Sequence, residues 1–110
     1  MSSLKPVAVI LVSGPDLASM RELANTVVNE RLAACANLLP GAVSVYRWEG
    51  RIETAEEVMV ILKTVPDRAE LLERRVSELH PYEVPEVVVL TSTGGSRAYA
   101  DWVHDCVEGE

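Results

Sequence analysis

The 110-residue sequence predicts an α+β fold of the ferredoxin-like class, with a four-stranded antiparallel sheet and two helices on one of its faces. Three observations lead to this prediction. Apolar residues follow strand and helix spacing in the order β-α-β-β-α-β, a further amphipathic segment predicts a C-terminal helix, and a tight turn joins two long middle strands. The length suits one core, so we expect a single domain over residues 1–110.

The first strand and helix are marked by a change in apolar spacing. A nearly continuous apolar run predicts a strand over residues 5–13 that is covered or central in a sheet. Gly14-Pro15 then turns the chain, and Asp16 is a residue type that caps helix N-termini. From Leu17 to about Arg31 the apolar residues recur at helical spacing, which predicts an amphipathic helix.

The two middle strands are unusually long. We expect one strand to run up to Trp48 with a bulge or bend at Pro40-Gly41, and a second to cover residues 51–64 after a hairpin turn at Glu49-Gly50. Strands of about 14 residues span ~45 Å, whereas a first helix of ~15 residues spans ~22 Å. The hairpin should therefore overhang its own domain. Because an apolar overhanging ribbon is unstable alone in water, we expect it to pair with another copy of the chain.

The second helix is expected to begin at Pro66-Asp67, where Asp67 and Glu70 resemble a capping box. His80-Pro81 should end this helix, because the residue before a proline disfavours the helical region. A fourth strand then follows over residues 85–91, rich in valine. This segment completes the β-α-β-β-α-β order.

The last helix should follow a hinge at Gly94-Gly95, with Ser96 as its N-cap. Its residues at helical spacing predict one apolar face. The residues expected on that face are Tyr99, Trp102, Val103 and Cys106.

Charge and composition exclude several kinds of partner. The chain carries 17 acidic and 10 basic residues, a net charge of −7, so neither nucleic acid nor an anionic membrane is an expected partner. No apolar run approaches the ~18–20 residues of a membrane span, and the short run near the start lacks the basic lead of a signal peptide. We therefore expect a cytoplasmic protein. Cys35 and Cys106 form no C-x-x-C pair, and no disulfide is expected.

The sequence does not predict an enzyme. Ser13, Ser92 and Ser96 lack the context of a nucleophile elbow, and no phosphate-binding loop of the G-x-x-x-x-G-K type is present. The stretch after the first strand also lacks the arginine-bearing anion cradle that small phosphatases of this fold require. We therefore expect a non-catalytic function.

Five segments along the chain form a recognisable pattern: ERLAACAN at residues 30–37, YRWEG at 46–50, ILKT at 61–64, HPYEVPE at 80–86 and YADW at 99–102. In order and spacing, these segments resemble the CutA family of divalent-cation tolerance proteins. The resemblance covers roughly residues 7–103. It implies a compact homotrimer in which the long hairpins extend the sheets of neighbouring subunits, and a link to tolerance of divalent cations, copper above all.

The resemblance, together with residue chemistry, suggests a weak metal site formed by His80, Glu83 and Cys35. Imidazole and thiolate are good ligands for copper. The competing interpretations are that His80 caps the helix and that Cys35, set among alanines, is a packing residue. Some relatives carry a cysteine where this chain has Val12 and a histidine where it has Leu79, so a strong soft-metal site is not expected.

A second hypothesis places a ligand cleft between subunits, as in the PII signalling proteins, whose trimers resemble those of the CutA family in architecture. The cleft would take a small anionic effector. Its residues would be Lys63, His80, Tyr82, Glu83, Tyr46 and Trp48. The aromatic residues could instead fill the subunit interface, which is favoured for Trp48, and Lys63 could pair with Glu83. A scaffold that binds another protein is the third alternative.

Overall fold

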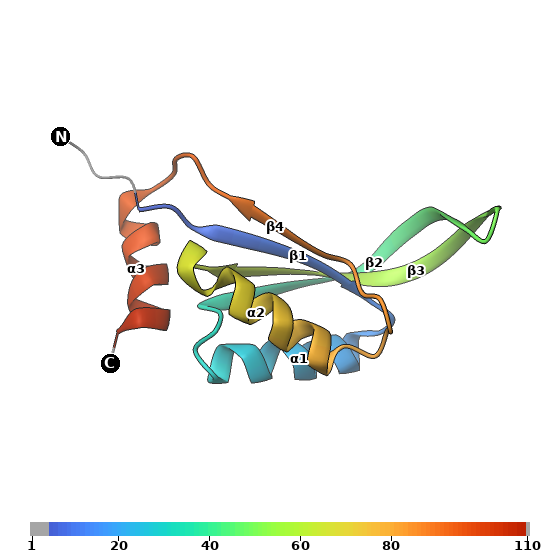
Figure 1. Cartoon of the computed structure of the whole chain (residues 1–110), viewed down its shortest axis with the longest axis horizontal. Helices are drawn as coiled ribbons and strands as arrows, with labels where there is room; N and C mark the ends of the chain where they lie inside the picture. The colour runs from blue at the N-terminus through green and yellow to red at the C-terminus, as the bar shows by residue number, and fades with distance from the viewer. Residues whose placement is uncertain (1–4, 110) are drawn as a thin grey trace.

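A computed structural model describes residues 5–109 and contains the predicted elements in the predicted order (Figure 1). The elements are β1 (Ala8–Gly14), α1 (Leu17–Asn29), β2 (Cys35–Trp48), β3 (Arg51–Thr64), α2 (Pro66–Leu79), β4 (Val87–Thr91) and α3 (Arg97–Glu108). The strands form one antiparallel sheet in the order β2-β3-β1-β4. The predicted ferredoxin-like α+β fold is therefore confirmed.

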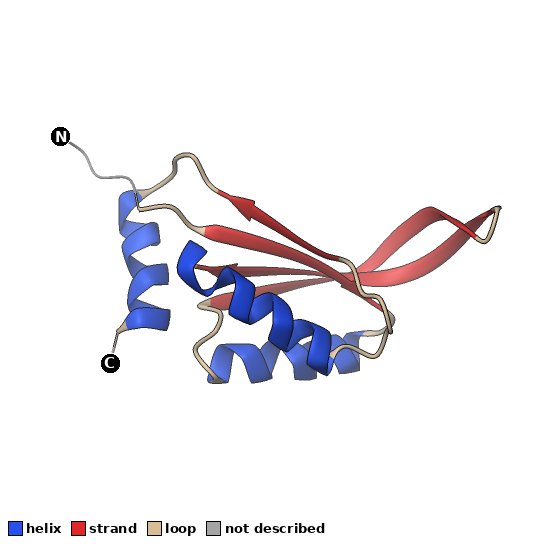
Figure 2. Cartoon of the chain, viewed as in Figure 1, coloured by secondary structure: helices blue, strands red, loops and turns tan. Residues whose placement is uncertain are grey.

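The helices cover one face and one end of the sheet. Figure 2 shows α1 and α2 side by side on the same face, and α3 across the end where β1 begins and β3 finishes. Alternate residues of the strands point toward α1 and α2, and α3 buries Val103 and Val107 in a separate apolar cluster with Val7 and Val65. The opposite face of the sheet carries no helix in the described chain.

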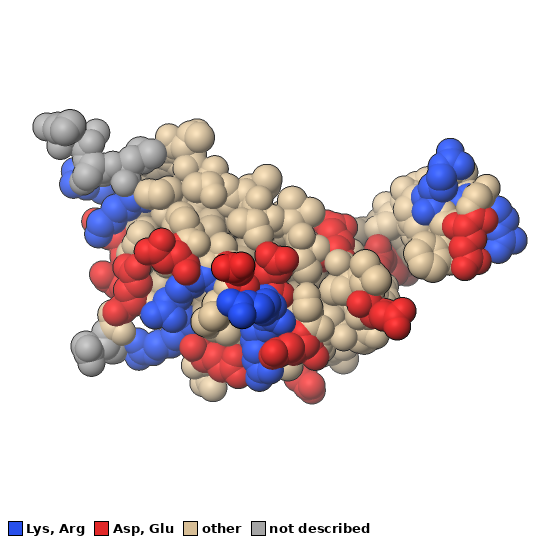
Figure 3. Space-filling model, viewed as in Figure 1, with Lys and Arg blue, Asp and Glu red and all other residues tan. Residues whose placement is uncertain are grey.

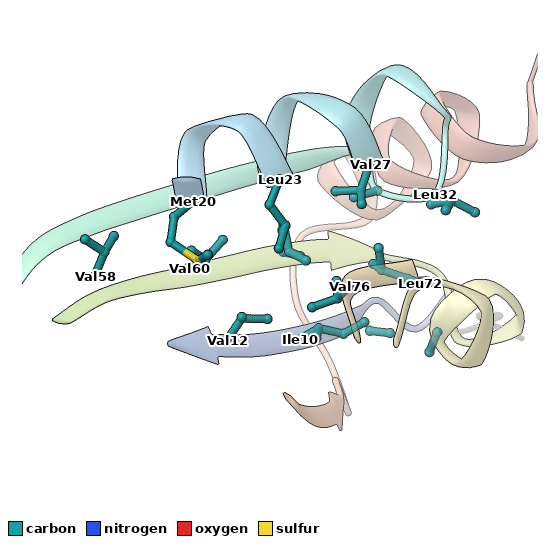
Figure 4. Close-up of a cluster of buried hydrophobic side chains, with 14 residues drawn as sticks. Ile10, Val12, Met20, Leu23, Val27, Leu32, Val58, Val60, Leu72 and Val76 are labelled. Carbon is teal, nitrogen blue, oxygen red and sulfur yellow. The ribbon is translucent and has the colours of Figure 1, made fainter. Parts of the chain in front are cut away.

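The main core lies between the sheet and the two helices (Figure 4). Met20, Leu23 and Val27 of α1 recur at helical spacing and are buried against the sheet. Ile10 and Val12 of β1 pack in the same core from the side of the sheet, because alternate residues of a strand share a face. Burial of these apolar side chains is the main force that holds the layers together.

The open face of the sheet is also apolar. Leu11 lies opposite Ile61 on one side and Val88 on the other, and all three point away from the helices because Ile10 points into the core. Leu39 and Leu90 are exposed on the surface. In Figure 3 charged side chains of both signs mingle over α1 and α2, whereas the surface over β4 has few of them.

The β2–β3 hairpin extends beyond the body, as predicted. Only Val58–Thr64 of β3 pair with β1, so the preceding seven residues of β3 pair with β2 alone and overhang by about 23 Å. The register shifts between Leu39 and Ala42, which confirms the bulge at Pro40-Gly41. The large side chains on the overhang are exposed, with 69% of Val43 and 60% of Trp48 accessible. Figure 1 shows this twisted ribbon leaving the body at one end.

Of the N-terminal caps predicted for α1 and α2, the first is confirmed and the second is wrong. Asp16 caps α1, since its Oδ1 accepts the Ser19 N–H at 2.7 Å, and this bond lowers the pKa of its carboxyl. The capping box at Asp67 was wrong, because Val65 is the N-cap residue of α2 and provides no side-chain bond. Pro66 takes the first helical position, where a missing N–H costs nothing, and this places Asp67 inside the first turn.

The C-terminal end of α1 and the buried face of α3 also differ from expectation. Helix α1 finishes at Asn29, two residues early, since Arg31 has a positive φ of 63°. Ser96 caps α3 as predicted. However, Tyr99 and Trp102 do not lie on its buried face, which consists of Ala100, Val103 and Val107. The two aromatic rings lie on the exposed side, with centroids 5.6 Å apart.

Candidate functional site

The side chain of His80 is buried between the end of β1 and the loop after α2. Its Nδ1 accepts the backbone N–H of Tyr82 at 3.0 Å, so Nε2 carries the proton and donates to the Ser13 carbonyl at 2.7 Å. The backbone N–H of His80 also donates to Val76 at the end of α2, which makes His80 the C-cap residue. Both ring nitrogens are therefore engaged within the chain, and a metal could bind Nδ1 only by displacing the Tyr82 N–H.

Tyr82 connects this loop to the base of the hairpin. Its hydroxyl donates to the Glu57 carboxylate at 2.8 Å, and its ring lies against His80 with centroids 4.9 Å apart. Burial, and then the hydrogen bond and charge of Glu57, raise the pKa of Tyr82 to about 12. Tyr46 and Asp16 are close enough to act in the same direction. The hydroxyl therefore keeps its proton at neutral pH and holds the loop to β3.

Two further carboxylates lie at this end of the sheet. Glu86 accepts a hydrogen bond from the Ser13 hydroxyl at 3.3 Å, beside the carbonyl that His80 contacts. Glu83 is exposed in the same loop, and within residues 5–109 it has no hydrogen-bond or ion-pair partner. We name the group formed by Ser13, Glu57, His80, Tyr82 and Glu86 the His80 cluster.

Lys63 lies far from the His80 cluster. It follows Glu57 by six residues on the same face of β3, which places the two backbones about 20 Å apart. The expected ion pair with Glu83 was wrong, since the Lys63 ammonium donates instead to the Asn37 side-chain oxygen. One chain therefore does not bring Lys63 into a cleft with His80 and Tyr82. Trp48, at the hairpin tip, is also separate from them.

Cys35 lies at the Lys63 end as well. It is the register partner of Lys63, and its sulfur is 3.5 Å from the Tyr99 hydroxyl. This contact and burial raise the pKa of Tyr99 to about 12. Cys35 is half-buried and free. Because its register partner Lys63 lies about 20 Å from Glu57 of the His80 cluster along β3, Cys35 cannot share a metal with His80 in the same chain. Within the described residues, no three His, Cys, Asp or Glu side chains surround a common point, and the expected metal residues do not form a site in one chain.

A cavity that was not predicted from the sequence lies at this second end of the sheet. It measures about 360 Å³ and lies between the strands and the start of α3. Lys5, Lys63 and Arg97 line it, although they are far apart in the sequence. Only Lys63 was singled out from the sequence, because a lysine that ends an apolar strand is conspicuous. Lys5 and Arg97 become neighbours only through the packing of α3.

The comparison with protein families matches residues 8–106 to the family described as CutA1 divalent ion tolerance protein. The chain belongs to this family. The divalent-cation tolerance protein CutA of Thermus thermophilus is 41% identical over 97 residues, which cover 88% of this chain and 94% of the relative. The protein of the same name from Citrobacter koseri is 43% identical over 102 residues, covering 93% and 89%. The family resemblance seen in the sequence is thus confirmed.

Solved structures of the CutA family have the same fold. CutA from Xylella fastidiosa superposes with a TM-score of 0.90 at 38% identity, covering 93% of this chain and 98% of the other. CutA1 from Oryza sativa superposes with a TM-score of 0.91 at 36% identity, covering 99% and 100%. The long hairpin is therefore part of a fold that these relatives share along nearly their whole length.

The names of other CutA relatives mention different compartments. A protein of Arabidopsis thaliana named "Protein CutA, chloroplastic" is 42% identical over 93% of this chain, and the chain spans 56% of that protein's length. A structure from Archaeoglobus fulgidus is described as a periplasmic divalent cation tolerance protein, at 29% identity and a TM-score of 0.89. Among residues 5–109, no helix has both the length and the apolar character needed to cross a membrane.

Proposed function

We propose that the chain works as a homotrimer in tolerance of divalent cations, without catalysis. The observation that carries this proposal is the family match over residues 8–106, together with relatives above 40% identity that bear the tolerance name. The two free cysteines suit a reducing compartment, which supports the cytoplasm as the place of action.

The trimer is supported by two exposed apolar surfaces. One is the open sheet face with Leu39, Val88 and Leu90, and the other is the overhanging hairpin. Both β2 and β4 are edge strands with unpaired backbone groups in the single chain. A neighbouring hairpin that adds to such an edge would satisfy these groups and cover the apolar side chains at once.

We propose that the assembly binds divalent metal ions weakly, with copper as the preferred ion. His80 is the nitrogen ligand, a type that suits copper, and carboxylates of the His80 cluster add negative charge nearby. Because the described part of one chain does not complete a site, the remaining ligands would come from more than one subunit. Coordination must also displace the Tyr82 N–H from Nδ1, which lowers affinity. The metal is cargo here and not a resident cofactor.

Calorimetric titration of the metal-free assembly with Cu(II) tests this proposal, with His80→Ala beside His104→Ala. His104 is a matched control, because its ring contacts Glu108 and the Pro6 carbonyl and lies outside the His80 cluster. We expect saturable binding with a fixed ratio per assembly, weakened in His80→Ala and unchanged in His104→Ala. Equal binding by all three proteins would remove His80 as a ligand.

An effector-binding regulator is the second candidate. The observation in its favour is the cavity beside Lys63, one of the residues proposed for the effector cleft. His80 and Tyr82 lie at the other end of the sheet, so they would join such a cleft only from another subunit. A thermal-shift screen separates the candidates, because anions would raise the unfolding temperature of an effector-binding protein while divalent metals would not.

A further inference from the structure

We propose that the cavity between β1, β3 and α3 binds a small organic anion, one that joins a carboxylate or phosphate group to a compact apolar part. The inference deepens the effector-binding candidate, from which it takes Lys63, and it is independent of cation tolerance. It replaces the expected cleft around His80 by a site lined by residues of one chain. Val9 and Lys63 of this lining are on the open sheet face, so in the proposed assembly a neighbouring subunit would border the site. We name this site the α3 cavity; its volume of about 360 Å³ falls within the range of small-molecule sites, ~300–1,000 Å³.

The charge of the α3 cavity is opposite to that of the molecule. Among residues 5–109, its charged lining residues are Lys5, Lys63 and Arg97, with no acidic residue among them, although the chain carries a net charge of −7. Lys5 pairs with Asp101 at 3.1 Å, whereas Lys63 donates to a neutral amide. Within residues 5–109 Arg97 takes part in no ion pair. At least two positive charges thus remain uncompensated at the cavity, which favours an anion.

The fold places these cations together without an evident structural need. Lys63 is at the end of β3, Lys5 precedes β1, and Arg97 is the first residue of α3. Like charges held close to one another repel, so the arrangement costs stability unless something negative joins them. Guanidinium and ammonium groups are the side chains that bind carboxylates and phosphates best. A bound anion would relieve this repulsion.

The start of α3 adds neutral donors to the same wall. The first turn of this 12-residue helix points its positive end at the cavity, and Gly94, Gly95 and Ser96 line the approach. A Cβ built on either glycine would meet nothing within 4 Å, so the space beside this backbone is open to a ligand. Tyr99 also lines the cavity with a hydroxyl that stays protonated at neutral pH. These groups can donate hydrogen bonds to an anion that the cations attract.

The remaining wall of the α3 cavity is apolar, which favours a ligand that has an apolar part beside its anionic group. The apolar lining residues are Val9 of β1, Val7 just before this strand, and Ala100 of α3. An inorganic ion would leave this wall in contact with water, whereas a ring or short alkyl chain would cover it. The ligand class is therefore an organic anion, for which phenyl phosphate is a suitable probe.

The test is a titration of the full-length assembly with phenyl phosphate, followed by the backbone amide signals in nuclear magnetic resonance spectra. Phenol serves as the uncharged control probe. We expect saturable shifts at the amides of Gly94, Gly95 and Arg97 with phenyl phosphate, and none with phenol. Inorganic phosphate should bind the same amides more weakly, because it cannot cover the apolar wall.

Two variants locate the site. The double variant Lys63→Gln, Arg97→Gln should weaken binding at least about tenfold, since each charge-assisted hydrogen bond contributes ~1.5–3 kcal/mol. The double variant Arg21→Gln, Arg74→Gln removes two cations outside the cavity and should bind as the wild type does. Gly94→Val keeps every cation but fills the space, so it should also weaken binding.

Thermal unfolding of each variant shows whether it is folded. If the double variant Lys63→Gln, Arg97→Gln does not fold, Gly94→Val still tests the site. The inference is overturned if phenyl phosphate gives no saturable shift at the three amides. It is equally overturned if both cavity variants bind like the wild type. Neither result bears on copper binding at the His80 cluster, which lies at the other end of the sheet.

Discussion

Gly14 closes β1 directly against the buried side chain of Met20. An ideal Cβ on this glycine would lie 2.2 Å from the Met20 sulfur, and Met20 is fully buried, so its side chain has little room to move away. Gly14→Ala should therefore destabilise the protein by about 1–3 kcal/mol through overpacking. Gly94→Ala is the matched control, because a Cβ there meets nothing within 4 Å. Denaturant unfolding at one fixed protein concentration compares the two; equal stabilities would contradict this account of Gly14.

Tyr82 provides a prediction about alkaline pH. Its pKa is about 12 in the folded protein against 10.0 when unperturbed, so between these values the folded state binds more protons than the unfolded state. The stabilising contribution is complete below about pH 10 and is lost as the pH rises toward about 12. Tyr82→Phe should make the pH dependence of unfolding shallower in this window. Part of the dependence should persist, because the pKa of Tyr99 is also about 12; an unchanged profile would contradict the Tyr82–Glu57 bond.

At the residue scale, local contacts were predictable and distant ones were not. Asp16 and Ser96 cap their helices as the sequence indicated, because a cap depends on residues three positions away. The partners of His80 were not predictable, since Ser13 is 67 residues distant and meets it only after the sheet and α2 have packed. The sequence likewise did not reveal the partner of Lys63. An ion pair with Glu83 was predicted, but the ammonium group donates to Asn37 on the neighbouring strand.

At the scale of elements, the β2–β3 hairpin is the most informative part of the chain. Glu49 and Gly50 both have positive φ, 50° and 79°, which is the conformation of a type I′ turn between twisted strands. Gly50→Val should destabilise the hairpin by roughly 1–2 kcal/mol, because a side chain is strained in this region. Glu49→Asn should be neutral or stabilising, since asparagine tolerates it. Unfolding curves of the two variants test this, and a more stable Gly50→Val protein would contradict the turn.

Element order and the length of β3 follow from the sequence because they depend on periodicity and on turn residues. The bounds Arg51–Thr64 agree with the prediction, since a turn and a proline delimit the strand. The start of α2 at Pro66 agrees with the prediction, but the capping box was wrong because Pro66 takes the first helical position and leaves Val65 as the N-cap residue, which a capping-box pattern does not reveal. The exposed aromatic side of α3 was missed because periodicity alone gives two candidate faces, and only packing against Val7 and Val65 selects one.

At the scale of the whole molecule, a single chain is 52 Å long but only 27 and 22 Å in its other dimensions, and the hairpin accounts for this shape. We expect the overhang to lie between subunits. Val45→Asp, on the exposed ribbon, should lower the mass of the assembly by placing a charge in an apolar interface. Val28→Asp on α1 is the control and should leave the mass unchanged; a loss of mass in both variants would indicate general destabilisation.

Light scattering after size-exclusion chromatography measures the mass of the wild-type assembly in solution and so tests whether the chain works as a trimer. We expect three times the chain mass of 12.0 kDa, constant over a wide range of protein concentration. A stable monomer would contradict it, since the apolar ribbon and the open sheet face would then be in water, and the metal site proposed between subunits would not exist.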